Sequence, residues 1–379
     1  MRSWAFVALV VAVLAAPASA AAPRILPFAD AWPVWSPDGS RIAFTRIYGS
    51  RMVLEVLTRT TGRVRSVASN AGQLSPSWSP DGSRLAFASG GRLYVAAVTG
   101  RGLDELAAPA RSYAPAWQPK GSLVAFLTTR GARNTDLWTV DVVDGRAALL
   151  AHDAIGVPAW APAGRDVAFQ RDDGIYVADV TTKAVRRVAL VVNPGPPAWS
   201  HDGKSLAFAA EGSVFVVPSD GSQPAKARTP VMRELGTPSW SRDDGRISFA
   251  HRGGVSVLEL ASGAVRTVAT FLVGSGGLAP FAPASDAIAY AGPRRDCPGH
   301  TAIRLVGGPA LTRTCVVAGT ARADVIDGSP REGDVILGLG GNDRIHANDG
   351  HADRVDCGAG RDVVWADRTD RVRGCERVL

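Results

Sequence analysis

One short unit recurs seven times along the chain and constrains the fold more than any other feature. Its first copy reads Trp35-Ser36-Pro37-Asp38-Gly39 and continues, two residues later, into Ile42-Ala43-Phe44. The copies begin at Trp35, Trp78, Trp117, Trp160, Trp199, Trp240 and, in a more degenerate form, Phe281. Neighbouring copies lie 39 to 43 residues apart, and six of the ten Trp occupy this one position. A fixed period of this length predicts a repeated supersecondary unit.

Each unit also reads as four short strands. The Pro-Asp-Gly sequence between the first two apolar runs is typical of a tight hairpin turn. Third and fourth runs follow, such as Met52–Leu57 and Val64–Val67, and no helix-length periodic segment interrupts them. Four short antiparallel strands every ~40–45 residues are typical of a β-propeller blade. We therefore predict an all-β chain with a seven-bladed propeller over residues 24–316, in which residues 24–27 close the ring.

The repeated motif resembles that of TolB-type, WD-like propellers, in which W-S-P-D-G precedes a short apolar strand. The resemblance covers residues 24–316. Members of that family usually have six blades, so six is the alternative to seven. TolB itself has an α/β domain before its propeller, whereas the first unit here follows the N-terminal apolar segment directly. A TolB-like role in the cell envelope is therefore only one of the functions considered below.

The repeated Trp, Asp and Gly could suggest sugar-stacking or metal sites. We interpret them as structural, because an aromatic residue at one phase of every repeat usually belongs to the core and Asp-Gly serves a turn. In propellers the ligand-contacting loops surround one mouth of the central channel, and those loops differ between the units.

The first residues predict export. Met1-Arg2-Ser3 gives a short positive start, Trp4–Ala16 is unbroken apolar sequence, and small residues follow to Ala20. This is the pattern of a signal peptide over residues 1–20, cleaved near Ala20. An uncleaved anchor is the alternative, but the apolar run is shorter than the ~20 residues of a spanning helix. We expect a secreted or cell-surface protein without a transmembrane anchor.

Composition narrows the class of partner. Hydrophobic residues make up 46% of the chain and charged residues 20%, which indicates a globular protein. The net charge of +7 comes from 42 basic and 35 acidic residues spread along the chain. That charge is too small and too dispersed to predict nucleic-acid binding.

The period changes from about residue 319. Aspartates recur every eight to ten residues, and two positions after each stands Ile or Val. The aspartates are Asp324, Asp334, Asp343, Asp353, Asp362 and Asp370. Residues 319–379 resemble the RTX, or hemolysin-type, calcium-binding repeat, and the closest match is the turn Gly338-Leu339-Gly340-Gly341-Asn342-Asp343.

The RTX resemblance implies a short parallel β-roll that binds calcium. Its ligands would be aspartate carboxylates and carbonyls of glycine turns, which suits a hard cation with six to eight oxygen ligands. The implied metal residues are Asp324, Asp334, Asp343, Asp353, Asp362, Gly338, Gly340 and Gly341. Asp343 and Asp362 should face one ion from successive coils. The alternative is a metal-free coil held by ion pairs between aspartates and Arg344, Arg354, Arg361 or Arg371.

All four cysteines lie in the last part of the chain, which in an oxidising compartment predicts disulfides. Sequential pairing, Cys297 with Cys315 and Cys357 with Cys375, is the simplest of three arrangements. The second pair is 18 residues apart, about one coil, and stacked positions on successive coils lie within disulfide reach.

The function predicted from sequence is that of a non-enzymatic, secreted binding or scaffold protein with a calcium-stabilised β-roll. The chain has no G-x-S-x-G, H-E-x-x-H or P-loop motif. We expect a monomer whose partner is an extracellular or envelope protein or a glycan. Two alternatives stay open: an extracellular propeller enzyme, such as a glycan lyase or hydrolase with its site at the channel mouth, and a TolB-like envelope accessory.

Overall fold

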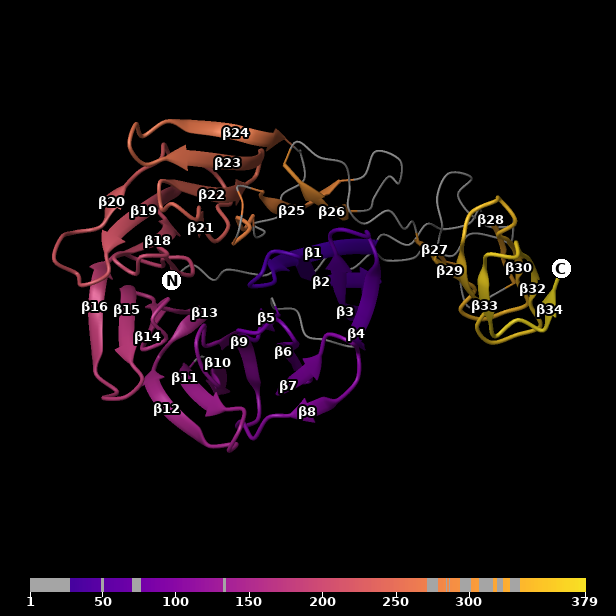
Figure 1. Ribbon diagram of the computed structural model, residues 1–379, viewed down its shortest axis with the longest axis horizontal. Helices are drawn as coiled ribbons and strands as arrows, with labels where there is room; N and C mark the ends of the chain where they lie inside the picture. The colour runs from indigo at the N-terminus through magenta and orange to yellow at the C-terminus, as the bar shows by residue number, and fades with distance from the viewer. Residues whose placement is uncertain are drawn as a thin grey trace. The chain divides into compact units, whose positions relative to one another are not determined.

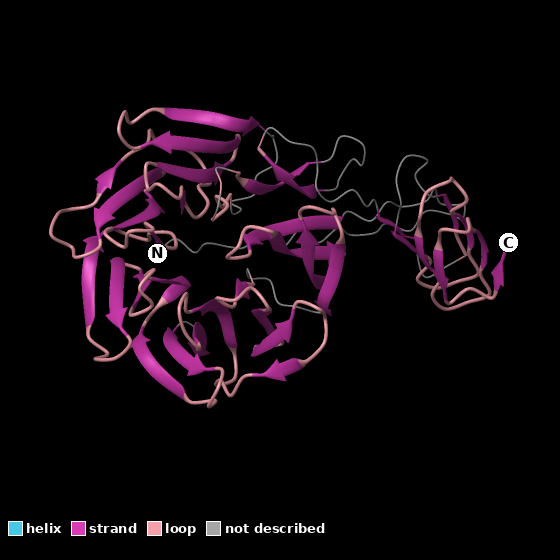
Figure 2. Cartoon of the chain, in the orientation of Figure 1, coloured by secondary structure: helices cyan, strands magenta, loops and turns pink. Residues whose placement is uncertain are grey.

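The computed structural model describes residues 28–48, 51–69, 76–131, 134–270, 279–283, 285, 287–293, 301–306, 316–318, 323–327 and 335–379. The chain divides into two compact units, residues 27–313 and residues 314–379 with 1–26. Every described element is a strand (Figures 1 and 2), and the described residues include no helix long and apolar enough to cross a membrane. Several predicted features lie outside the described residues: the signal peptide, residues 24–27, Cys297, Cys315 and Asp334.

The larger unit is a ring of six described sheets (Figure 1). The first has the order β25 (Ala289–Pro293), β26 (Thr301–Leu305), β1 (Phe28–Trp35), β2 (Arg41–Tyr48), β3 (Arg51–Thr58), β4 (Val64–Ser69). The second contains β5 (Ser77–Trp78), β6 (Arg84–Ser89), β7 (Arg92–Ala97) and β8 (Leu103–Glu105). The third contains β9 (Ser112–Trp117), β10 (Leu123–Arg130), β11 (Asn134–Asp141) and β12 (Ala147–His152).

The other three sheets repeat the same order of strands. The fourth contains β13 (Ile155–Trp160), β14 (Asp166–Arg171), β15 (Gly174–Asp179) and β16 (Val185–Leu190). The fifth contains β17 (Ala198–Trp199), β18 (Ser205–Ala210), β19 (Ser213–Pro218) and β20 (Lys226–Ala227). The sixth contains β21 (Ser239–Trp240), β22 (Arg246–His251), β23 (Gly254–Glu259) and β24 (Val265–Thr270). Figure 1 shows the outer rim formed by β4, β8, β12, β16, β20 and β24, with the Trp-bearing strands nearer the centre.

The prediction of seven blades is wrong, because the described strands form six sheets and the Phe281 unit has none of its own. That unit contributes one isolated bridge, Phe281 with Ile288, and the hairpin β25–β26. The hairpin joins the first sheet through one parallel pairing of β26 with β1, Ala29 opposite Thr301. The seventh repeat is therefore an extension of the first sheet.

The repeated Trp packs between sheets, as the sequence predicted. The indole Nε1 of Trp78 donates to Val34 O at 3.0 Å, and Trp160, Trp199 and Trp240 bond in the same way to the residue before the preceding Trp. Trp35 donates to Pro280 O at 3.1 Å, so the Phe281 unit provides the equivalent carbonyl for the first sheet. Five phenylalanines of the second strands, Phe44, Phe126, Phe169, Phe208 and Phe249, are fully buried beside these contacts.

The C-terminal residues form two parallel sheets, which is consistent with the predicted β-roll. One contains β27 (Val316–Ala318), β29 (Val335–Leu337), β31 (Arg354–Asp356) and β33 (Arg371–Arg373). The other contains β28 (Val325–Asp327), β30 (Arg344–His346), β32 (Val363–Trp365) and β34 (Arg377–Val378). The core of this coil is made of Ile326, Ile336, Ile345, Ala347, Val355, Cys357 and Val364.

Candidate functional site

Asp343, Asp353 and Asp362 lie inside the coil, and each precedes an inward aliphatic residue by two positions. Alternate residues of a strand point to opposite faces. Asp343, Ile345 and Ala347 are accordingly buried, with exposed fractions of 1%, 0% and 0%. Asp362 is buried in the same way beside Val364, at 0% for both residues. The sequence pattern of Asp followed by x and Ile or Val therefore places carboxylates in the core.

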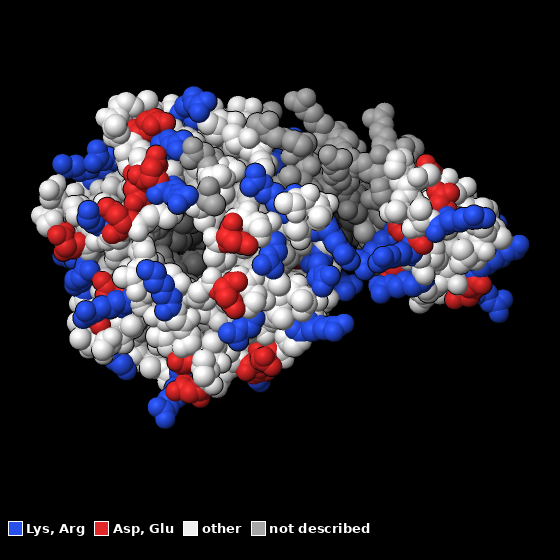
Figure 3. All heavy atoms as spheres, viewed as in Figure 1, with Lys and Arg blue, Asp and Glu red and all other residues white. Residues whose placement is uncertain are grey.

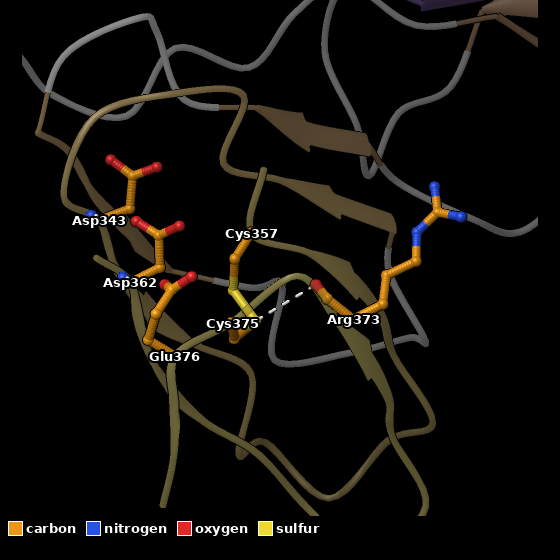
Figure 4. The surroundings of a disulfide bond; sticks show 6 residues. All are labelled: Asp343, Cys357, Asp362, Arg373, Cys375 and Glu376. Atoms are coloured by element: carbon orange, nitrogen blue, oxygen red, sulfur yellow. Dashed lines mark hydrogen bonds between the residues drawn. A yellow bond between two sulfur atoms is a disulfide. The ribbon is translucent and has the colours of Figure 1, made fainter. Parts of the chain in front are cut away.

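The buried carboxylates form a ladder along the coil, shown in part in Figure 4. Oδ1 of Asp343 accepts a hydrogen bond from the amide of Asp324 at 2.9 Å, and Oδ1 of Asp362 accepts one from the amide of Asp343 at 2.7 Å. Each carboxylate thus caps the backbone of the equivalent residue one coil earlier. The predicted stacking of Asp324, Asp343 and Asp362 is confirmed, and we call this series the first ladder.

Glu376 completes the first ladder, and the sequence analysis did not single it out. Its Oε2 accepts from the amide of Asp362 at 2.7 Å, in the position of a further Asp. The separation is 14 residues rather than 19, because the last coil is shorter. The one signal available was that Glu376 stands directly before the apolar-and-basic run of β34, as Asp343 stands before β30.

A second ladder lies on the other side of the turns. Oδ1 of Asp370 accepts from the amide of Asp353 at 2.8 Å, and its Oδ2 accepts from the amide of Asp367 at 2.6 Å. Asp353 is 2% exposed. Asp334, which the sequence placed in this series, lies outside the described residues.

Two carboxylates of the first ladder each keep one oxygen without a hydrogen-bond donor among the described residues. These oxygens are Oδ2 of Asp343 and Oδ2 of Asp362, and both are buried. Burial raises the pKa of Asp343, and the nearby charges of Asp362 and Asp324 raise it further, while the Asp324 amide lowers it. Stacked carboxylates in a dry interior repel unless a proton or a cation stands between them.

Arginine does not supply that cation among the described residues. Arg344, Arg354, Arg361 and Arg371 are exposed and form no ion pair with a described aspartate. The described Arg–Asp pair of the coil is Arg373 with Asp356, at 2.6 Å on the outer surface. These four arginines therefore form no ion pair with a described aspartate, and the metal-free coil stays an alternative.

The glycine turn before Asp343 brings backbone close to the ladder. A Cβ at Gly338 would lie 2.7 Å from Oδ2 of Asp343 and 2.1 Å from Cys357 O, so no side chain fits there. The amide of Gly341 bonds to Ala359 O at 2.9 Å, and Gly340 forms a parallel bridge with Ala359. Successive turns are thus stacked by backbone hydrogen bonds, with glycine at the closest approach.

The carboxylate oxygens of the first ladder supply some, but not all, of the ligands that a hard cation needs. Two buried carboxylate oxygens have no partner among the described residues, and their rungs stack at about the 4.8 Å spacing of strands. This spacing leaves room for oxygen ligation at ~2.4 Å from an ion between the rungs. The described residues contain no group of three or more His, Cys, Asp or Glu placed to hold a metal. Any ion would therefore depend on two carboxylates together with backbone oxygens.

The disulfide Cys357–Cys375 is present, as predicted, and joins the last two coils beside the first ladder (Figure 4). The Cα atoms are 5.1 Å apart, within the range for stacked positions of neighbouring coils. Cys357 is fully buried in the core of the coil. The bridge therefore fixes the alignment of the final coil.

On the propeller, the repeated Asp is a turn residue. Oδ1 of Asp38 accepts from the hydroxyl of Ser36 at 2.5 Å and from the amide of Ser40 at 3.1 Å. The hydroxyls of Ser36 and Ser40 lower the pKa of Asp38 to about 2. Asp81 has the same bonds and a pKa of about 2. These carboxylates are occupied within their own turns, which supports the structural interpretation.

A buried ion-pair cluster links β1, β2 and β3 of the first sheet. Arg46 forms two hydrogen bonds to Asp30, at 2.7 and 2.9 Å, and an ion pair with Glu55 at 2.9 Å. The three side chains are 3%, 0% and 6% exposed. Removing one member of such a cluster leaves a buried charge unpaired and destabilises the fold.

A second cluster lies at the edge of the third sheet. Nδ1 of His152 lies 3.0 Å from Oδ1 of Asp136, and Arg130 pairs with the same carboxylate at 3.2 Å. His152 and Arg130 are each 55% exposed, whereas Asp136 is 6% exposed. The residues belong to β10, β11 and the outermost strand β12. Figure 3 shows acidic and basic side chains interspersed over the visible face of the propeller, without one large patch.

Comparison with known proteins shows which propellers this one resembles. Residues 31–154 match the family model described as TolB beta propeller domain. The propeller is TolB-like. The family match does not reach residues 319–379, so the calcium-binding repeat stays a prediction.

Solved structures share the fold at low identity. TolB from Acinetobacter baumannii is 19% identical, with a TM-score of 0.48 and 64% of each chain covered, so this chain spans less than two thirds of its length. A putative TolB from Agrobacterium tumefaciens is 19% identical, with a TM-score of 0.51 over 67% of this chain and 97% of that one. Oligogalacturonate lyase from Vibrio parahaemolyticus is 12% identical, with a TM-score of 0.59 over 73% and 90%. No curated protein matches the chain in sequence.

Proposed function

We propose that the chain is a secreted, non-enzymatic binding protein whose TolB-like propeller presents loops to an extracellular or envelope protein or glycan. Binding is favoured over catalysis because the Arg46 and Asp136 clusters of charged side chains are either buried and paired or away from the innermost strand of their sheet. Arg46, Asp30 and Glu55 are buried and paired with one another. The Asp136 cluster lies toward the outer strands of its sheet, away from the innermost strand β9.

The coil, in this proposal, is stabilised by calcium. The observation that carries it is the pair of buried, unpartnered Oδ2 atoms on Asp343 and Asp362. These two carboxylates would hold the ion, with oxygens of the Gly338–Gly341 turn. A bound cation neutralises the stacked charge. A site of the ~10⁻⁴–10⁻³ M class suits an extracellular module.

Hydrogen exchange of the full chain tests calcium. Calcium should slow exchange over residues 335–379 and leave the propeller unchanged, because the ion binds only the folded coil. The double variant Asp343→Asn, Asp362→Asn should lose this response. Asp356→Asn, which removes a surface carboxylate of the same coil, is the matched control and should keep it. An unchanged exchange pattern on adding calcium to the wild-type protein would exclude calcium as the stabilising ion.

An extracellular propeller enzyme is the second candidate. It is supported by the fold shared with oligogalacturonate lyase and by the exposed His152 held by Asp136. A lyase would form an unsaturated product from oligogalacturonate, visible by ultraviolet absorbance, and His152→Ala would abolish it. The binding proposal predicts no product with the wild-type protein. A third candidate, a TolB-like envelope accessory, is supported by the family match alone.

A further inference from the structure

A residue shortly before the innermost strand of each of the third to sixth sheets has a left-handed backbone conformation. These residues stand six or seven positions before the repeated Trp of their unit, and none of them is glycine. They are Arg111 (φ 63°), Asp153 (φ 57°), Asn193 (φ 48°) and Glu234 (φ 56°). Arg and Glu rarely adopt positive φ, and such outliers cluster at binding sites. We call these four residues the left-handed ring.

The loops of the left-handed ring are fixed by backbone hydrogen bonds of 2.7 to 3.1 Å. Each bond joins a ring residue, or its direct neighbour, to the hairpin between the second and third strands of a sheet. The pairs are Thr129 N with Arg111 O, Ala154 N with Thr135 O, Asn193 N with Asp172 O and Arg252 N with Arg233 O. The ring side chains therefore start from rigid backbone, which lowers the entropy that is lost when a ligand binds.

The four side chains of the left-handed ring reach solvent near the centre of the propeller. All four residues are exposed, and the side chains of Asp153 and Glu234 are 66% and 49% exposed. Figure 1 shows the Trp-bearing strands, which these residues precede, nearest the centre. Because the repeat starts each of these strands on the same face of the propeller, the four residues surround the centre of one face. They differ from sheet to sheet, as ligand-contacting loops do.

The left-handed ring combines both signs of charge. Oδ1 of Asp153 lies 3.9 Å from Nη2 of Arg130, and Oε1 of Glu234 lies 3.8 Å from Nη1 of Arg252. Exposed ion pairs of this length contribute little to stability. The side chains of Arg111 and Asn193 make no hydrogen bond or ion pair with a described residue. The ring therefore offers hydrogen-bond donors and acceptors that the described fold does not need.

An aromatic side chain on the innermost strand of the first sheet also lies outside the buried core. Trp32 has a left-handed backbone (φ 52°), at the position that Ala114 (φ 52°) holds on the third sheet, and the pairing of β1 with β2 skips it. It is half-buried and makes no hydrogen bond or ring contact with a described residue. A tryptophan in this setting can cover the apolar face of a sugar ring.

We propose that the left-handed ring and Trp32 bind an uncharged oligosaccharide. Carboxylate, amide and guanidinium groups together match hydroxyl groups, which both donate and accept hydrogen bonds. The ligand must be extended, because the ring residues come from several sheets. Asp153 and Glu234 disfavour an acidic polymer, and the arginines disfavour a basic one. This inference rests on the function proposed above and narrows its partner to a neutral glycan.

Glycine variants remove the ring side chains without straining the fold, because glycine adopts positive φ at no steric cost. The double variant Asp153→Gly, Glu234→Gly removes both carboxylates, and Arg111→Gly removes a guanidinium group. Lys183→Gly is the matched control, since Lys183 is exposed and has φ 60° in the turn between β15 and β16. That turn lies at the opposite end of the strands from the ring. Thermal unfolding checks that each variant is folded.

The probes are cellohexaose, mannohexaose and chitohexaose, with hexagalacturonate as the acidic counterpart. We expect the full chain to bind a neutral hexasaccharide but not hexagalacturonate, with an affinity that changes by less than about twofold between ~0.05 and ~0.5 M salt. The double glycine variant should weaken this binding roughly tenfold or more, and Arg111→Gly roughly fivefold. Trp32→Gly should weaken it and Trp32→Phe should retain it. Lys183→Gly should change it by less than about twofold.

Two results would overturn this inference. Binding to none of the neutral hexasaccharides would reject the ligand class, and uncleaved binding of hexagalacturonate would then keep the proposed binding function with another ligand. Unchanged affinity of the folded glycine variants would place the ligand elsewhere on the propeller. Cleavage of a neutral hexasaccharide that the glycine variants abolish would instead support the ring and contradict the non-enzymatic function. The two proposals therefore fail in different ways.

Discussion

Replacing Asp343 by Asn should stabilise the coil when calcium is removed. Asn keeps an oxygen to accept the Asp324 amide, which now bonds to Oδ1 at 2.9 Å. It removes the charge at Oδ2, which is buried without a partner. The new amide group can donate to the neighbouring rung instead of repelling it. The substitution therefore keeps the ladder bond and removes the repulsion.

The size of this effect follows from the rung spacing. Two carboxylates ~4.8 Å apart repel by roughly 3 kcal/mol at an effective dielectric constant of about 20. A gain of that size, from the repulsion of one neighbouring carboxylate, corresponds to exchange slower by roughly 100-fold. Asp343→Ala removes the charge and also the hydrogen bond, so it should leave the Asp324 amide unsatisfied and be less stable than Asn by about 1–3 kcal/mol.

The assay is hydrogen exchange in chelator, read at amides bonded between coils. Arg344 N donates to Asp324 O at 2.8 Å, and Val363 N donates to Asp343 O at 2.9 Å. Asp356→Asn is the control, and its loss of the exposed Arg373 pair should cost less than about 1 kcal/mol. Faster exchange in Asp343→Asn than in the wild-type protein, without calcium, would refute the reasoning. It would mean that the Asp343 carboxyl is already neutral or paired when it is buried.

Three further perturbations separate the other structural roles. Trp78→Ala should destabilise the propeller by ~3–5 kcal/mol in urea unfolding, and a stable variant that has lost ligand binding would instead make Trp78 a binding residue. Burial lowers the pKa of His251, so the neutral form of His251 stabilises the fold above the unfolded pKa of 6.5. This stabilisation is lost as the pH falls below 6.5. Thermal unfolding from pH 7.5 to 5 should show the loss, and the variant His251→Gln should not show it. The double variant Cys357→Ser, Cys375→Ser should destabilise the coil by about 3 kcal/mol and leave the melting temperature of the propeller unchanged. A lower melting temperature of the propeller would contradict the expectation that the two units unfold independently.

The sequence predicted the propeller strands but not how the strands join into sheets. Motif phase places Trp78 between blades correctly, because one aromatic position per repeat must meet the same neighbour in every repeat. The Phe281 unit has the phase of a blade and supplies Pro280 O to Trp35. Sheet membership, however, depends on which backbone edges pair, and the pairing of Ala29 with Thr301 assigns β25–β26 to the first sheet. The spacing of the sequence repeat does not show which strand edges pair.

In the coil, the sequence pattern predicted where the aspartates lie, but it did not predict which groups their carboxylates bind. Asp followed by x and an aliphatic residue located Asp343 and Asp362 on the inner face, and their separation of 19 residues located them on successive coils. It did not indicate that one oxygen of each carboxylate would cap a backbone amide. Glu376 was missed because the last coil is shorter and the residue type changes. The propeller's buried Arg46 cluster was also missed, since its members are spread over three strands without a repeated spacing.

Because side chains alternate along the coil, the ladder aspartates lie on its inner face and the arginines beside them in sequence on its outer face. This separation also fixes the register of the strands. Asp343, directly before β30, is buried, and Arg344, the first residue of β30, is exposed. A slip of one residue would exchange the two faces, so that Ile345 became exposed and the Arg344 guanidinium was buried. Burying that cation beside a carboxylate would also remove the cap of the Asp324 amide, so the slipped register loses both apolar burial and a hydrogen bond. The Cys357–Cys375 bridge, whose Cα atoms are 5.1 Å apart, opposes the same slip between the two coils that it joins. Inner carboxylates and outer arginines can therefore vary independently.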